Sequence, residues 1–369
     1  MRRILTVAVT TTMLAGAAAA QAAPTLSTSD RLDDRRYVVS GSRAYVVGSE
    51  AGRFPAQGWH IRGEMGGVWT PPLKLVDGIW FGIDDQWIGP ATRFTSGFGH
   101  VKMDLPVTAG LQAQRVEVVP DGRRAALVGL RLRNPGRTRT VTVMVDTHSE
   151  LMSAYPWGWT TPSAASFNEQ DSATAANGRL VFTEPRGWAA VVGASERPVR
   201  TLTGPNHRGP QDPAVICPTD GPAPPRCDDS AAGKGAGGQL RYRFTIPARE
   251  SRTLWVAVAG SEKGRDAAVA EHRAALANPE AALRAKVAQR ERLARWTRVS
   301  LPGDRLLEQG IEWAKQNLAD SVQEARDLEV RWVDEGTRYP PPDGIVPRVR
   351  FYGAGFPDYP WLFATDGEF

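Results

Sequence analysis

The sequence predicts a mostly β protein with helices towards its C-terminal side, in which a large antiparallel β-sandwich is followed by helical segments. Apolar and polar residues alternate in many short runs between Tyr37 and about Ala259. Glycine- and proline-rich turns separate these runs, and the apolar period changes at Ser261 from two to about four. Alternation with a period of two is typical of strands, whereas the longer period is typical of helices.

The strand prediction rests on short runs rich in Val, Leu and Tyr, at residues 36–39, 44–47, 114–119, 126–132, 140–145, 188–192, 240–246 and 253–258. In residues 126–132 the leucines Leu130 and Leu132 alternate with Arg131. A strand with one apolar face and one solvent-exposed face fits an antiparallel sheet that covers a core on one side. Many such strands predict a β-sandwich over residues 37–260.

Turn residues refine this prediction. Pro120-Asp121-Gly122 and Asn134-Pro135-Gly136 separate three successive strands, which predicts a meander from about residue 114 to 146. Two long segments with few strand signals, 149–178 and 201–238, are predicted to be loops. Loops of this length are unusual in a compact domain and suggest a function or mobility.

Helix signals begin after Ser261. Residues 267–276 are rich in Ala, and Asn278 followed by Pro279 predicts the capped start of a second helix that runs to about Trp296. Asp304 is a plausible cap for a third. The third helix has an apolar stripe, interpreted as a packing face, at Leu307, Ile311, Ala314, Leu318 and Val322.

The N-terminus has the form of a secretory signal peptide. Arg2 and Arg3 precede an apolar run from residue 4 to 20, and Ala20-Gln21-Ala22 suits a signal peptidase. A membrane anchor is the alternative, although the run is short and interrupted by Thr. We therefore expect residues 1–22 to be a signal peptide and the protein to be secreted or periplasmic.

The charge and the cysteines limit the classes of partner and cofactor that we expect. The formal net charge is +5, and no run of Lys or Arg is interleaved with aromatic residues, so a nucleic-acid partner is not expected. Cys217 and Cys227 lie close together in a Pro-rich segment, and in an exported chain they are predicted to form a disulfide. A metal site is the alternative, but no histidine has suitable spacing, so we expect no metal and no cofactor.

The last nineteen residues combine carboxylates with aromatic rings. Asp358, Asp366 and Glu368 lie among seven aromatic residues that include Trp361 and Phe363. Rings that stack on sugar C–H surfaces, beside carboxylates that bind hydroxyls, are what a carbohydrate pocket needs. We call these residues, 351–369, the closing stretch.

The order of these features resembles a known superfamily. A β-sandwich, a linker helix, the helix at 309–318 and then Pro360-Trp-Leu-Phe-Ala-Thr-Asp366 resemble the six-hairpin glycosidases. The resemblance is greatest to bacterial glycogen-debranching (amylo-α-1,6-glucosidase) proteins and glucoamylase-like glycoside hydrolases, although many of these carry an Arg where this chain has Thr365. It implies a β super-sandwich (37–260), a helical linker (261–300) and the start of an incomplete (α/α)6 catalytic barrel (301–369).

The resemblance also implies roles. Asp366 is expected to bind sugar hydroxyls, with Trp361 and Phe363 as pocket walls and Glu368 as a further substrate-binding candidate. From the residues alone, Asp366 could instead be a general acid or the first residue of an Asp-Gly turn. Family enzymes hydrolyse α-glucans or oligosaccharides by inversion, with an acid and a base expected beyond Phe369, so this portion alone is expected to be inactive.

Two other functions stay open. The tryptophans and the long loops would also suit a non-catalytic secreted β-sandwich that binds carbohydrate or a cell-wall partner. Another six-hairpin activity, such as a trehalase or a polysaccharide lyase, shares the same architecture. The tryptophans of the N-terminal third are interpreted mainly as core and packing residues, namely Trp59, Trp69, Trp80 and Trp87. The sequence does not define an oligomeric state.

Overall fold

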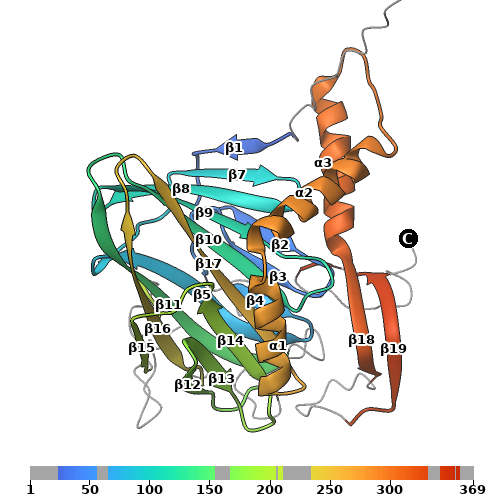
Figure 1. Ribbon diagram of the computed structural model, residues 1–369. Helices are drawn as coiled ribbons and strands as arrows, with labels where there is room; N and C mark the ends of the chain where they lie inside the picture. The colour runs from blue at the N-terminus through green and yellow to red at the C-terminus, as the bar shows by residue number, and fades with distance from the viewer. Residues whose placement is uncertain are drawn as a thin grey trace, which may run out of the picture.

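A computed structural model describes residues 24–55, 65–153, 167–204, 207–210, 234–330, 341–353 and 355–357. In these residues the chain forms two large antiparallel sheets, a separate two-stranded sheet and three helices (Figure 1). The two large sheets face each other across one apolar core, which confirms the mostly β character that the alternation predicted.

The nine-stranded sheet forms one layer of the sandwich within the described residues. Its strands, in spatial order, are β1 (Leu26–Thr28), β7 (Arg93–Gly97), β8 (His100–Thr108), β9 (Leu111–Val118), β10 (Ala125–Arg133), β17 (Ser251–Ser261), β14 (Ala189–Ala194), β13 (Arg179–Thr183) and β12 (Ser172–Ala176). Neighbouring strands pair antiparallel throughout, as expected for strands with one covered face.

The eight-stranded sheet forms the facing layer. Its strands, in spatial order, are β15 (Arg200–Thr203), β16 (Gly237–Ile246), β11 (Arg139–Ser153), β5 (Leu73–Ile83), β4 (Gly67–Thr70), β3 (Tyr45–Ser49) and β2 (Arg36–Ser40), with β6 (Gln86–Trp87) paired to β5. The long strands β11 and β5 lie side by side at its centre, with irregular register after His148. All eleven residues of β5 are buried, so both faces of this sheet are covered there.

The predicted meander at 114–146 is wrong in its third strand. β9 and β10 pair as a hairpin, but β11 belongs to the other sheet, where it pairs with β16 and β5. Asn134 explains why the chain passes from one sheet to the other at this point. Its buried side-chain amide donates to the carbonyls of Arg137, Ile246 and Pro247, at 2.7, 3.0 and 3.2 Å. These bonds fix the Asn134-Pro135-Gly136 segment as a bridge between the sheets rather than a hairpin turn.

The predicted loops are shorter than expected. β11 continues to Ser153, and β12 lies inside the segment assigned to the first loop. β15 and the start of β16 likewise lie inside the segment assigned to the second. These strands carry many Ser, Thr, Ala and Gly residues, which give weak strand signals, and they form because neighbouring strands provide partners.

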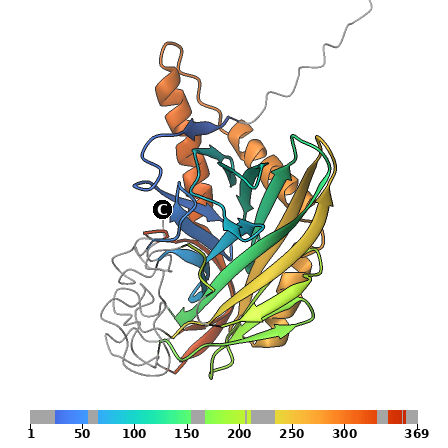
Figure 2. The same cartoon turned by 90° about the vertical axis from the view of Figure 1, so that its left-hand side faces the viewer.

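The second and third helices begin at the caps that were predicted for them, Asn278 and Asp304, whereas no cap was predicted for the first. The three helices are α1 (Arg265–Leu276), α2 (Pro279–Arg295) and α3 (Arg305–Ser321). The side chains of Asn278 and Asp304 each accept a hydrogen bond from a backbone N–H of the first turn, at 2.9 Å. α1 and the start of α2 pack on the outer face of the nine-stranded sheet, against a cluster that includes Trp255 and Ala275 (Figure 2).

After α3 the chain forms a β-hairpin, the pair β18 (Val322–Val330) and β19 (Gly344–Tyr352). The (α/α)6 barrel predicted for 301–369 is therefore not confirmed, because the described residues there show one helix and one two-stranded sheet. The predicted packing stripe of α3 is largely uncovered, with Leu307 and Leu318 exposed at 53% and 60%. No helix of the described ranges is long and apolar enough to cross a membrane.

Candidate functional site

Most residues named from the sequence lie outside the described residues. This holds for the substrate-binding candidates Asp366, Trp361, Phe363 and Glu368, and for Asp358. The signal peptide at 1–22 and the disulfide between Cys217 and Cys227 also fall outside, so these stay predictions.

The closing stretch contacts the outer face of the eight-stranded sheet through Phe356 and Pro357. Phe356 meets Tyr45 of β3 edge to face, with ring centroids 5.2 Å apart, and the Tyr45 hydroxyl donates to the carbonyl of Pro357 at 3.4 Å. Tyr45 in turn stacks on Trp69 of β4, at 6.3 Å between centroids. Tyr45 and Trp69 are fully buried, so these aromatic residues serve packing, as the sequence suggested for Trp69.

Beside this aromatic contact, the same sheet carries a buried cluster of charged groups. Lys74 and Asp77 come from β5 and His148 from β11. The Lys74 ammonium lies 2.9 Å from Asp77, whose other oxygen lies 2.8 Å from His148 Nδ1. A fourth group, the Arg208 guanidinium, lies 3.6 Å from the same carboxylate. We call these four residues the Asp77 cluster.

The Asp77 cluster keeps its carboxylate ionised. Burial alone would raise the pKa of Asp77, but the neighbouring Lys74, His148 and Arg208 together hold it well below its ordinary value. His148 is fully buried, and its Nε2 has no hydrogen-bond partner in the part of the chain that the structure describes. The carboxylate therefore fixes the orientation of an imidazole whose second nitrogen is left unused.

A second polar group lies where β11 ends. Ser149 donates from Oγ to Asp171 Oδ2 at 2.6 Å, and the same oxygen accepts from the backbone N–H of Leu151 at 3.0 Å. Burial raises the pKa of Asp171 to about 7 despite these hydrogen bonds, so this carboxyl can hold or release a proton near neutral pH. Asn168 donates to Glu150 next to it, at 2.5 Å.

A third carboxylate, Asp146, holds the segment 207–210 on β11. It accepts from Gln239 at 2.7 Å and from the backbone N–H of Gly209 at 3.1 Å. Gly209 lies against Trp80 of β5, where a side chain would clash with the indole. Burial raises the pKa of Asp146. Among the described residues no group of three or more His, Cys, Asp or Glu side chains is placed to hold a metal.

These buried groups can store a proton and fix strand geometry, but they are closed to a substrate. Places open to a small molecule are hollows at the surface. One, of about 260 Å³, lies beside Trp80, Trp87 and Arg53. Another, of about 200 Å³, lies between the sandwich and β18, beside Arg124 and Trp188.

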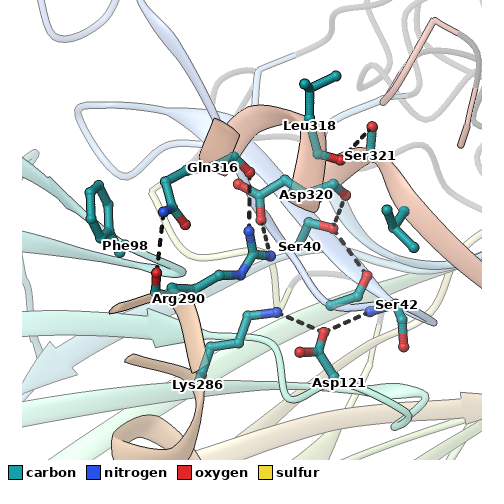
Figure 3. A network of polar contacts seen from close by, with 12 residues as sticks. Ser40, Ser42, Phe98, Asp121, Lys286, Arg290, Gln316, Leu318, Asp320 and Ser321 are labelled. Atoms are coloured by element: carbon teal, nitrogen blue, oxygen red, sulfur yellow. Dashed lines mark hydrogen bonds and ion pairs between the residues drawn. The ribbon is translucent and has the colours of Figure 1, made fainter. Parts of the chain in front are cut away.

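A polar network connects the sandwich, α2 and α3, the helix from which β18 follows directly (Figure 3). Lys286 of α2 donates to Asp121 of the sandwich at 2.7 Å. One turn later Arg290 donates to Asp320 of α3 at 2.6 Å and to the carbonyl of Gln316 at 3.0 Å. Ser40 of β2 donates to the carbonyl of Asp320 at 2.7 Å. We call this the linker network.

The sequence reasoning missed the Asp77 cluster and the linker network. The sequence does carry a signal for the Asp77 cluster. Lys74 and Asp77 interrupt the apolar run of a central strand, and charged residues occur in such a place only when they are paired. Its partner His148 was dismissed because the five histidines show no ligand spacing. The linker network gave no comparable signal. Lys286 and Arg290 are four residues apart, but basic residues at this spacing are common on the solvent-exposed faces of helices, so the spacing does not predict a buried contact.

Comparisons with known proteins give little beyond this geometry. No protein-family model and no curated protein matches the chain. Among solved structures, a putative kojibiose phosphorylase from human microbiome is similar with a TM-score of 0.47 and 9% sequence identity. The match covers 77% of this chain and 39% of that one, so the chain spans less than half of that protein's length. A likeness at this level carries no argument about activity.

Proposed function

We propose that this chain is the sandwich-bearing portion of an exported glycoside hydrolase that acts on an α-glucan or oligosaccharide by inverting acid–base hydrolysis. The observation that carries the proposal is the closing stretch, with its resemblance to six-hairpin glycosidases and its alternation of carboxylates with aromatic rings. Its described start is anchored on the sandwich through Phe356 and Tyr45.

In this proposal the sandwich supports the pocket, and the closing stretch lines it. Asp366 binds hydroxyls of the sugar, Trp361 and Phe363 form walls, and Glu368 provides a further acceptor. An inverting glycosidase needs a carboxylic acid and a carboxylate several ångströms apart, with a water between the base and the sugar ring. We assign neither role to a described residue, because the buried carboxylates Asp77, Asp146 and Asp171 are closed to a substrate.

Binding of maltooligosaccharides to the 369-residue chain tests the assignment of the closing stretch. We expect Asp366→Asn to weaken binding about tenfold, since one charged hydrogen bond contributes roughly 1.5 kcal/mol. Asp358→Asn, in the same stretch, is the matched control and should bind as the unaltered chain does. Equal affinity of all three proteins in calorimetry would remove Asp366 from the site.

Turnover tests the remainder of the proposal. We expect the 369-residue chain to show no release of sugar from maltooligosaccharides. A protein that continues into a barrel should release the β-anomer from an α-linked substrate, as proton NMR detects. Steady hydrolysis by the 369-residue chain, or release of the α-anomer, would contradict the proposed mechanism.

A second candidate function, non-catalytic carbohydrate binding by the sandwich, is favoured by the 260 Å³ hollow beside Trp87. Trp87 is only partly buried, whereas its neighbour Trp80 is 6% exposed and held by packing. In this case Trp87→Ala, and not Asp366→Asn, should abolish binding to soluble glucan. Trp296→Ala, which removes an indole that is 77% exposed elsewhere, is the control.

A further inference from the structure

The hollow between the sandwich and the hairpin has the features of a binding site. It encloses about 200 Å³ and is lined by residues of both parts. The sandwich contributes Arg43, Arg124 and Trp188 to the lining, and β18 contributes Gln323 and Arg326. Its volume lies below the roughly 300–1,000 Å³ that is usual for ligand pockets, so it suits a molecule no larger than about a monosaccharide.

Arg124 leaves one donor without an acceptor. Its side chain is almost fully buried, its Nε donates to Thr70 Oγ1 at 2.7 Å, and its Nη1 pairs with Glu262. Its Nη2 is buried and has no hydrogen-bond partner in the described part of the chain. A buried charged donor without a partner is destabilising, and an anion in the hollow would provide the missing acceptor.

Arg43 adds an uncompensated charge. It is half-buried and makes no ion pair or hydrogen bond within the described ranges. Burial lowers the pKa of Arg43, and the nearby guanidinium groups of Arg124 and Arg326 lower it further. The carboxylates of Glu271 and Glu262 raise the pKa of Arg43 by smaller amounts, and the charge of Arg43 in turn lowers the pKa of Asp327, although none of these acids forms an ion pair with Arg43.

Those carboxylates are already engaged. Glu262 pairs with Arg124, and Glu271 accepts from the Arg124 backbone N–H at 3.4 Å and lies 3.8 Å from Arg123. On the hairpin, Glu324 is shared by Arg326 and Arg348, at 2.6 and 2.7 Å. Three of the cations that line the hollow are therefore paired with lining carboxylates, and Arg43 is the one without an ion pair among the described residues. The charged lining residues are Arg43, Arg124, Lys263, Arg326, Glu262, Glu324, Asp327 and Glu329.

The remaining lining indicates what else a ligand would carry. Gln323 is 3% exposed, and its Oε1 has no hydrogen-bond partner within the described residues, which leaves an acceptor suited to a hydroxyl. Apolar walls are formed by Pro71, Pro72, Leu73 and Phe351. We propose that the hollow binds a hydroxy acid of monosaccharide size, such as a hexuronate, with its carboxylate between Arg43 and Arg124 and a hydroxyl on Gln323.

This inference is independent of the proposed glycosidase function, since it uses none of the proposed substrate-binding residues, and of the closing stretch it uses only Phe351, in an apolar wall. Calorimetry on the full chain should detect sodium glucuronate and give at least tenfold weaker binding for glucose, which has the same ring without the carboxylate. Inorganic phosphate is the third ligand, and it should bind more weakly than glucuronate because it lacks a ring for the apolar walls.

Arg43→Gln is the decisive variant. It removes a charge that is unpaired and crowded by two others, so the protein should fold and its Tm should not fall, while affinity for glucuronate should drop at least tenfold. Arg93→Gln, on the exposed side of β7, is the control and should leave affinity unchanged. Arg124→Lys should also weaken binding, because an ammonium group cannot replace the forked pair of N–H donors that a guanidinium presents to a carboxylate.

Three results would overturn the inference. They are equal binding of glucose and glucuronate, unchanged glucuronate affinity in Arg43→Gln, and phosphate binding as tight as that of glucuronate. The last result would assign the hollow to a simple oxyanion.

Discussion

At the scale of single residues, the buried charges of the Asp77 cluster are the most consequential feature of the sandwich. Lys74 and Asp77 are 1% and 4% exposed, so neither is solvated by bulk water. A charge in such a place is tolerated because its partners replace the lost hydration, and removing one partner leaves the other uncompensated.

Replacing Lys74 with Met should therefore destabilise the fold by about 3–5 kcal/mol in urea denaturation. Lys263→Met is the matched control, because Lys263 pairs with Asp327 on the surface, where an ion pair contributes less than about 1 kcal/mol. If Lys74→Met were as stable as Lys263→Met, the cluster would not depend on its ammonium.

Asp171 should give the stability of the protein a specific pH dependence. Its pKa is about 7 in the folded state, raised from an ordinary value of 3.8, so between these values the folded protein binds more protons than the unfolded chain. The stability from this group is complete below about pH 4 and is lost as the pH rises through 7.

Asp171→Asn should flatten the fall of unfolding free energy between pH 4 and 7, by up to roughly 1.4 kcal/mol per pH unit. Urea titrations at several pH values measure the slope. Asp34→Asn changes an exposed carboxylate and should retain the slope of the unaltered protein. An unchanged slope in Asp171→Asn would mean that this carboxyl is already ionised at pH 4.

At the scale of elements, the sequence was most informative where a single local signal decides the structure. Asn278 and Asp304 cap helices as predicted, because capping depends on a few neighbouring residues. The hairpin β18–β19 was missed, since β18 reads Val-Gln-Glu-Ala-Arg-Asp-Leu-Glu-Val, a charged pattern common on helices. Its strand form depends on pairing with β19, which no local pattern reveals.

The bridge at Asn134 shows the same limit and can be tested. Asn134→Ala removes two amide N–H groups, which three carbonyls share, and the Oδ1 that accepts from the Gly136 N–H, so it should cost about 2–4 kcal/mol at roughly 1 kcal/mol for each bond. Asn278→Ala removes only a helix cap and should cost about 1 kcal/mol. Equal losses in thermal or urea unfolding would show that Asn134 does not join the two sheets.

At the scale of the whole molecule, the linker network decides whether the helices and the hairpin move with the sandwich. α2 packs on the sandwich, and its Lys286 and Arg290 face opposite partners, one in the sandwich and one in α3 (Figure 3). The sequence predicted a β-rich part followed by helices, and the described residues show strands β1 to β17 before α1, α2 and α3. The sequence could not predict their docking, because Asp121 and Asp320 are far apart in the chain.

Arg290→Met should uncouple α3 and β18–β19 from the sandwich. Hydrogen exchange should accelerate at least tenfold in residues 305–330 and remain unchanged in β10 and β17. Arg292→Met changes an exposed arginine of the same helix and should leave both regions protected. Faster exchange in β10 and β17 as well would mean that the molecule opens as one unit.

The position of β17 has a consequence for how the protein is made. β17 is the last strand of the sandwich in the chain, yet it lies between β10 and β14 in the middle of the nine-stranded sheet. During translation the edges of β10 and β14 therefore wait without their shared partner until residue 261 has left the ribosome. The nascent chain therefore exposes the unpaired edge of β10 from residue 133 until residue 261, which is 128 residues later, and an unpaired strand edge of this kind favours protection by chaperones.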